Sequence, residues 1–165
     1  MTPSLSQFVM LRGMRHHVLT WGSASAPKVF LLHGWMDVGA SFQFLVDALT
    51  HNWFVVAPDL RGFGGSEWQQ QGYWFYDYIA DLEALIDHYA AGEPVNLLGH
   101  SLGGLMATYN VSRHRKQKMA ALVALEAEIL RVADVARRHD PGPQRARIVE
   151  TLLPDPVPLE RRRVR

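Results

Sequence analysis

Short apolar runs alternate along the chain with segments whose apolar residues recur at helical spacing. Four runs are continuous, end at polar or glycine residues, and have the length of strands buried on both faces of a parallel sheet. They cover residues 28–32, 53–57, 95–98 and 119–125. Between them, residues 41–49 and 77–89 carry apolar side chains three and four positions apart, which predicts amphipathic helices. Connections of this length favour right-handed βαβ units, so the sequence predicts an α/β fold with a mostly parallel sheet and helices on both faces.

The same pattern predicts several local features. Residues 8–21 are expected to form two short strands around a turn at Arg12-Gly13. Ser41 is the predicted N-cap of the first helix, because a serine hydroxyl accepts a hydrogen bond from an unpaired backbone N–H there. Asp81 falls on the polar side of the second helix and is expected to face solvent.

The character of the chain changes after Glu126. Residues 128–139 have the composition of one further helix, but five of the nine prolines fall beyond residue 140 and the chain ends in an arginine-rich stretch. We therefore divide the chain into the N-terminal part of an α/β domain, residues 1–127, and a helix followed by a basic, Pro/Arg-rich irregular tail, residues 128–165.

The charged residues are also distributed unevenly along the chain. Residues 1–112 hold four Lys/Arg and nine Asp/Glu, a net charge of −5, whereas residues 113–165 hold thirteen and seven, a net charge of +6. Such a split marks either a basic arm for nucleic acid or membranes, or a tail outside the packed domain. No aromatic interleaving and no amphipathic basic helix accompany the arginines, so we expect neither a nucleic-acid partner nor a membrane partner.

The strongest chemical motif is Gly99-x-Ser101-x-Gly103, which directly follows the apolar run at 95–98. A chain that turns so sharply from strand to helix holds its central residue in a strained backbone conformation and lifts the hydroxyl clear of the sheet. The flanking glycines lack a Cβ and permit the close approach that this turn requires. The N–H of Leu102 then lies at a helix N-terminus, available to an oxyanion. The motif predicts a nucleophilic Ser101; the alternative is a glycine-rich turn with an idle serine.

A second segment agrees with this interpretation. His33-Gly34-Trp35 follows the apolar run at 28–32, and in folds with such an elbow the loop after this strand supplies the other oxyanion donor. We assign that donor to the backbone N–H of Trp35. His33 is interpreted as a hydrogen-bonded structural histidine, and Gly34 and His100 are expected to support the same site.

Polar and aromatic residues follow the apolar run at 53–57. Asp59 and Arg61 are interpreted as braces of a glycine-rich turn rather than as reacting groups. The aromatic residues of the next loop either line an apolar acyl pocket or simply pack the loop; they are Trp68, Tyr73, Trp74 and Phe75.

Four segments resemble the α/β-hydrolase superfamily, in the family's order and at its spacing: LLHGWMDVGASF, VVAPDLRGFGGS, YWFYDYIADLEALIDHY and VNLLGHSLGG. The similarity covers about residues 5–126 and is closest to bacterial serine-hydrolase-like members of the dehalogenase/lipase type. It implies a truncated α/β-hydrolase fold, hydrolysis of small esters or related acyl substrates by a Ser, an acid and a His, and neither cofactor nor metal. Relatives that act on epoxides and haloalkanes carry Asp at the elbow, so Ser101 favours acyl chemistry.

The later strands, which carry the acid and the His in the family, have no recognisable counterpart here. Glu126, at the end of the last apolar run, is the candidate acid, or else a polar residue at a strand end. His139 follows that run and is the candidate base. Without a base the hydroxyl of Ser101 stays protonated and weakly nucleophilic, so the chain is either an active or an inactivated hydrolase. The missing half and the charge change suggest a truncated or frame-shifted version of a longer enzyme.

The composition excludes several kinds of site and of protein. The 165 residues include no cysteine, which excludes disulfides, thiolate metal sites and a Cys nucleophile. No apolar run is long enough for a transmembrane helix, and the first ten residues lack the pattern of a signal peptide, so we expect a cytoplasmic protein. The expected partner is a small ester-type substrate. The alternative is a non-catalytic fragment that binds a partner or self-associates through an exposed sheet edge.

Overall fold

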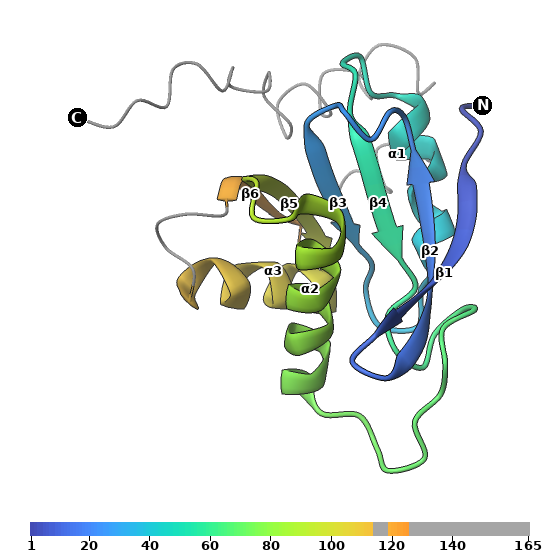
Figure 1. Cartoon of the computed structure of the whole chain (residues 1–165), viewed down its shortest axis with the longest axis vertical. Coiled ribbons are helices and arrows are strands. Elements are labelled where there is room, and N and C mark those ends of the chain that lie inside the picture. The colour runs from blue at the N-terminus through green and yellow to red at the C-terminus, as the bar shows by residue number, and fades with distance from the viewer. Residues whose placement is uncertain (114–118, 126–165) are drawn as a thin grey trace, which may run out of the picture.

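The computed structural model describes residues 1–113 and 119–125, which build one mixed sheet with helices on both faces (Figure 1). Its strands are β1 Leu5–Leu11, β2 Met14–Trp21, β3 Lys28–Leu32, β4 Phe54–Pro58, β5 Val95–His100 and β6 Met119–Leu125. They lie in the order β1-β2-β4-β3-β5-β6. β4, β3, β5 and β6 run parallel, whereas β2 is antiparallel to both of its neighbours. The expected α/β fold with a mostly parallel sheet is confirmed.

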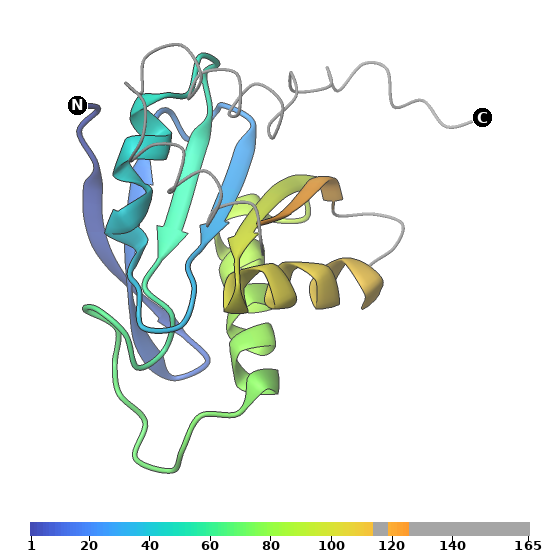
Figure 2. The same ribbon diagram turned by 180° about the vertical axis from the view of Figure 1, so that it is seen from behind.

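Helices cover both faces of this sheet. The short 3-10 helix η1 Gly39–Phe42 and α1 Gln43–Asp47 pack on one face, and α2 Phe75–Ala90 and α3 Leu102–Arg113 pack on the other. Figure 1 shows α1 behind the sheet and α2 in front of it, and Figure 2 shows the reverse view.

The parallel strands are apolar throughout because both of their faces are buried. In β3, Phe30 and Leu32 join the core under α2 and α3, while Val29 and Leu31 join the core under α1. All four side chains are fully buried. Each such burial contributes about 1.5–3 kcal/mol of transfer free energy, so this strand is an anchor of the fold.

The first two strands form the expected hairpin. Seven residue pairs align β1 with β2, and Leu11 lies opposite Met14. The two turn residues, Arg12 and Gly13, have φ of 50° and 81°. Positive φ at both central residues is the signature of a type I′ turn, whose twist matches that of the strands.

The prediction that Ser41 caps a helix is wrong. Ser41 lies inside η1, its hydroxyl donates to the carboxylate of Asp37, and neither η1 nor α1 has a side-chain cap. The helical segment begins two residues before Ser41, at Gly39, which places Ser41 inside it. Gly39 packs closely against β4, because a Cβ there would lie 2.7 Å from the carbonyl oxygen of Ala57.

The prediction that Asp81 faces solvent is also wrong. Asp81 is 7% exposed and lies on the inner side of α2. Partners from distant parts of the chain, detailed below, override the simple amphipathic pattern of the helix.

The predicted helix at 128–139, the boundary at 127 and the tail at 128–165 lie outside the described residues. Within residues 1–113 and 119–125, no helix is both long and apolar enough to cross a membrane.

Candidate active site

Ser101 occupies a sharp turn between β5 and α3. Its φ is 51°, in the left-handed region that residues other than glycine rarely adopt. Ser101 is exposed to solvent, whereas the preceding strand is buried from Val95 to Gly99. The carbonyl of Ser101 accepts the N–H of Leu105 at 3.0 Å, which starts α3 immediately after the turn. The geometry is that of a strained residue held out at the end of the sheet.

Two glycines make this turn possible. A Cβ on Gly99 would lie 2.3 Å from the carbonyl carbon and oxygen of Gly103. A Cβ on Gly103 would lie 2.1 Å from the carbonyl oxygen of Leu32. Both clashes are with backbone atoms, so α3 approaches β5 and the end of β3 at distances that only glycine allows. The roles expected for both glycines in the turn are therefore consistent with the packing.

The substitution Gly103→Ala is expected to lower the free energy of unfolding by about 1–3 kcal/mol. In a helix interior alanine is ordinarily more stabilising than glycine. A decrease in the free energy of unfolding would therefore result from the clash with Leu32 and not from helix propensity. Urea unfolding measures the effect. Thr108→Ala, at an exposed position of the same helix, is the control and is expected to change stability by less than about 0.5 kcal/mol. A Gly103→Ala protein as stable as the parent would contradict the close approach.

The loop after β3 lies beside the elbow. Leu32 is opposite Gly99 in the parallel pair of β3 and β5. A Cβ on Gly34 would lie 2.8 Å from Nδ1 of His100, so the imidazole of the half-buried His100 packs against the loop. The backbone after β3 and the residue preceding Ser101 are therefore in contact, as the sequence predicts.

His33 holds this loop in place. Its Nε2 accepts the N–H of Leu60 at 2.9 Å, so its Nδ1 carries the proton and donates to the carbonyl of Gly34 at 2.7 Å. Burial lowers the pKa of His33, although the Gly34 carbonyl and nearby Asp37 and Asp59 oppose the shift. A buried neutral ring that uses both nitrogens has a structural role, as expected.

Trp35 and Leu102, the two residues expected to supply oxyanion donors, lie on the segments next to Ser101. Trp35 is 59% exposed, and its ring packs edge-on against Phe63 at 5.1 Å. Leu102 is the first residue of α3, where N–H groups lack an intrahelical acceptor. Both backbone N–H groups therefore belong to segments that converge on Ser101.

The turn after β4 is braced by Asp59. Its Oδ1 accepts the N–H of Gly39 at 2.7 Å, and its Oδ2 accepts the N–H of Gly65 at 2.8 Å. The hydroxyl of Ser66 donates to the Asp59 carbonyl at 2.6 Å. The interpretation of Asp59 as a brace agrees with these contacts.

Arg61 forms a buried ion pair with Asp81. Its Nε donates to Oδ2 at 2.6 Å and its Nη2 donates to Oδ1 at 2.7 Å. His16 Nε2 lies 3.2 Å from the same Oδ2, and Arg12 reaches Oδ1 at 3.0 Å. Burial alone would raise the pKa of Asp81, but the hydrogen bonds from His16 and Arg61 outweigh it and the pKa lies below its ordinary value.

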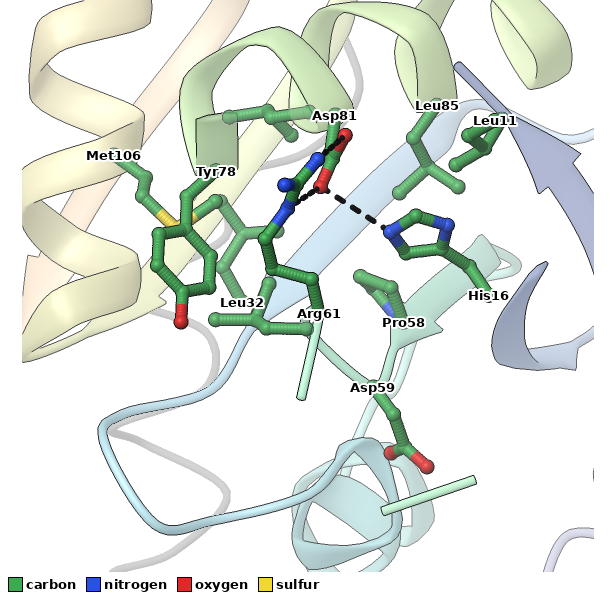
Figure 3. A pocket seen from close by; sticks show the side chains of 12 residues that line it. Leu11, His16, Leu32, Pro58, Asp59, Arg61, Tyr78, Asp81, Leu85 and Met106 are labelled. Carbon is green, nitrogen blue, oxygen red and sulfur yellow. Dashed lines mark hydrogen bonds and ion pairs between the residues drawn. The ribbon is translucent and has the colours of Figure 1, made fainter. Parts of the chain in front are cut away.

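A pocket lies around this ion pair and not over Ser101. Figure 3 shows Arg61 and His16 pointing toward Asp81, while Asp59 points away from them. The apolar residues that line the pocket come from both strands and helices: Leu11, Leu32, Leu82, Leu85 and Met106. The sequence did not reveal that His16, Arg61 and Asp81 meet, because they lie on β2, after β4 and on α2.

The aromatic residues after β4 divide into two groups. Trp68 and Trp74 are 74% and 69% exposed. Tyr73 stacks on Tyr78 at 6.4 Å, and Phe75 packs edge-on against a tyrosine of α3 at 5.9 Å. Tyr73 and Phe75 therefore pack the loop, whereas the two tryptophan side chains are exposed.

The candidate acid Glu126 and the candidate base His139 lie outside the described residues. Within the described part, three histidines are engaged elsewhere: His16 with Asp81, His17 with Asp59, and His33 with its own loop. The described residues also contain no group of three or more His, Asp or Glu side chains that could hold a metal ion.

The sequence of this chain is similar to those of known hydrolases. The chain is 37% identical over 100 residues to a soluble epoxide hydrolase of Corynebacterium sp. (strain C12), a stretch of 61% of this chain and 34% of the relative. It is 38% identical over 92 residues to a pimeloyl-[acyl-carrier protein] methyl ester esterase of Neisseria meningitidis, 54% of this chain and 33% of the relative.

A solved structure agrees with the fold. The 2-hydroxy-6-oxo-6-phenylhexa-2,4-dienoate hydrolase of Rhodococcus sp. strain RHA1 superposes with a TM-score of 0.66 at 27% identity, over 74% of this chain and 46% of that one. The chain thus spans about a third to a half of the length of these proteins. The family model described as alpha/beta hydrolase fold matches residues 27–152, past residue 126, where the recognisable resemblance in the sequence ends. The chain therefore belongs to the α/β-hydrolase fold family.

Proposed function

We propose that this chain is a serine hydrolase that acts on a small ester or related acyl substrate, with Ser101 as its nucleophile. The observation that carries the proposal is the left-handed backbone of Ser101, at 51°, between a buried strand and the N-terminus of α3. Strain of this kind costs on the order of 1–3 kcal/mol and persists where the surroundings enforce it. Here it presents a hydroxyl to solvent at the edge where β3 and β5 end.

The proposed reaction is attack of Ser101 Oγ on the acyl carbon. The carbonyl oxygen becomes an oxyanion, which accepts hydrogen bonds from the backbone N–H groups of Trp35 and Leu102. A base takes the Ser101 proton and returns it to the leaving alcohol, and water then hydrolyses the acyl-serine. His139 is the proposed base and Glu126 the proposed acid.

The names of the relatives support hydrolysis but differ in substrate. One is an epoxide hydrolase and another a methyl ester esterase. The elbow residue favours the ester, because family members that open epoxides use an Asp carboxylate there and this chain has Ser101. A serine hydroxyl forms a tetrahedral acyl intermediate that the two N–H donors can stabilise.

A fluorophosphonate probe tests the proposal. We expect Ser101 of the folded chain to carry a phosphonyl adduct, because such probes react with activated serines. Intact-mass measurement followed by peptide fragmentation locates the adduct. The control is Ser23→Ala, which removes an exposed hydroxyl whose hydrogen bonds, among the described residues, are to Ser25 in the same loop. It is expected to leave labelling of Ser101 unchanged.

A folded chain that shows no adduct at Ser101 would overturn the serine-hydrolase proposal. That outcome would favour the alternative of a non-catalytic member that binds a partner or self-associates. Elution volume in size-exclusion chromatography would then separate a monomer from a self-associated chain.

A further inference from the structure

A second serine, far from the elbow, is part of a hydrogen-bonded Ser–His–Asp chain. Ser6 Oγ lies 2.8 Å from Nε2 of His17, and Nδ1 of His17 lies 2.8 Å from Oδ2 of Asp59. The three residues stand on β1, on β2 and directly after β4. Nucleophile, base and orienting carboxylate within hydrogen-bond reach is the arrangement that activates a serine, and it is recognised by geometry and not by position in the sequence.

The surroundings of Asp59 fix the direction of these hydrogen bonds. Its two oxygens already accept backbone N–H groups of Gly39 and Gly65, so the carboxylate acts as an acceptor. Nδ1 of His17 therefore donates to Asp59. In a neutral ring this leaves the lone pair of Nε2 facing Ser6, whose hydroxyl donates to it.

The backbone on both sides holds the imidazole in this orientation. The N–H of His17 donates to the hydroxyl of Ser66 at 2.9 Å, and its carbonyl accepts the N–H of Asp59 at 2.8 Å. A Cβ on Gly65 would lie 3.0 Å from Cβ of His17, so the turn after β4 packs against the ring. The base is pre-positioned by the fold before any ligand arrives.

Exposure increases along the chain of hydrogen bonds. The side chain of Asp59 is 5% exposed and that of His17 is 18% exposed, while Ser6 is exposed on the edge strand. In a hairpin closed by a two-residue turn, hydrogen-bonded and non-hydrogen-bonded pairs alternate from the turn, which places Ser6 opposite Leu19 in a non-hydrogen-bonded pair. The N–H of Ser6 therefore points out of the sheet edge, where it can reach a developing oxyanion at its own side chain.

Neighbouring side chains give the site an apolar wall and a cation. The ring of Phe8 lies 5.3 Å from that of His17, and the guanidinium of Arg15 lies 4.8 Å from the centroid of Phe8. An open surface with these features suits a small activated ester or phosphonyl compound, and it offers no deep acyl pocket.

We propose that Ser6, His17 and Asp59 form a second reactive site, at which Ser6 is covalently modified by activated acyl and phosphonyl compounds. Ser6 Oγ attacks the acyl carbon or phosphorus, and its proton passes to Nε2 of His17. The bond to the leaving group breaks, and the proton is released with the departing alcohol or fluoride. β2, β4 and β3 separate β1 from β5, so at about 4.8 Å per strand the site lies roughly 19 Å from the elbow and is independent of Ser101.

Labelling of the Ser101→Ala chain with a fluorophosphonate tests the inference separately from the proposed function. We expect one adduct, located at Ser6 by fragmentation of its peptide. The further substitution Ser6→Ala is expected to abolish it, whereas Ser4→Ala, at an exposed serine in the same peptide, is expected to leave it unchanged. His17→Gln is expected to slow labelling of Ser6 by about 10²-fold, the effect of losing a general base.

Three results would overturn the inference. They are a folded Ser101→Ala chain with no adduct at Ser6, an adduct at Ser4 in its place, and a labelling rate at Ser6 that His17→Gln leaves unchanged. Far-UV circular dichroism establishes the fold of each variant. Should His17→Gln unfold the chain, the paired Ser6→Ala and Ser4→Ala variants still decide the question, because both side chains are exposed.

Discussion

Replacing Ser101 with alanine is expected to lower the rate of aryl acetate hydrolysis by about 10³-fold or more, since the proposed nucleophile and its acyl-serine are lost together. Measured in a Ser6→Ala background, turnover reports the elbow alone. The release of p-nitrophenolate from p-nitrophenyl acetate follows the reaction directly. A chain that keeps its rate without the Ser101 hydroxyl would show that hydrolysis takes place elsewhere.

The backbone of Ser101 supplies a matched control for folding. Alanine keeps the left-handed strain at φ 51°, whereas glycine removes a strain of about 1–2 kcal/mol. Ser101→Gly is therefore expected to be at least as stable as the parent and as inactive as Ser101→Ala. Loss of activity in a stabilised variant would separate the chemical role of the hydroxyl from any effect on the fold.

The substitution Asp81→Asn is expected to lower the free energy of unfolding by about 3–5 kcal/mol. The side chains of Asp81 and Arg61 are 9% and 3% exposed, and their bidentate contact has N–O distances of 2.6 and 2.7 Å. Asparagine would leave the buried guanidinium with only the more distant carboxylate of Asp77, at 3.6 Å, and would turn an amide donor toward another donor. Urea unfolding with the m-value compared between variants measures the loss.

Two further variants show whether the charge is the cause. Asp87→Asn, at an exposed aspartate of the same helix, is expected to lower stability by less than about 1 kcal/mol, because an exposed charge pair contributes little. The double variant Arg61→Met/Asp81→Leu is expected to be more stable than Asp81→Leu alone, because it removes both charges from the interior. A double variant that loses the sum of the two single effects would contradict a direct pairing.

The same carboxylate predicts how stability depends on pH. The pKa of Asp81 is lowered by its hydrogen bonds to His16 and Arg61, which outweigh burial. A lowered folded-state pKa means that the unfolded chain binds the proton first, so this stabilisation is complete above about pH 4 and is lost as the pH falls through the folded-state value. Acid unfolding of Asp81→Asn should accordingly be less steep than that of the parent.

Most local features of this chain followed from its sequence, although the expected cap at Ser41 did not form. The continuous apolar runs predicted β3 and β6 to the residue, because a strand buried on both faces needs no alternation of polar side chains. The sharp turn at Ser101 could also be predicted, since the strand, the two flanking glycines and the helix are neighbours along the chain. The sharp turn at Ser101, the loop at His33 and the family follow from such short-range patterns.

The long-range polar contacts could not be predicted from the sequence. Asp81 matched the polar side of an amphipathic helix, yet Arg61, twenty residues away, draws it inward. Ser6 and His17 are eleven residues apart and His17 and Asp59 forty-two, so no local spacing marks them as a unit.

There is a physical reason why the sequence predicts the strands but not the long-range polar contacts. Apolar burial is non-directional and depends on the period of the pattern, which a sequence displays. A hydrogen bond needs two specific atoms within about 3 Å, and sheet order and strand register decide which atoms meet. The sequence by itself therefore determined the strands, the elbow and its serine. Only the tertiary structure decided that Asp81 is buried beside Arg61, and that His17 bridges Ser6 and Asp59.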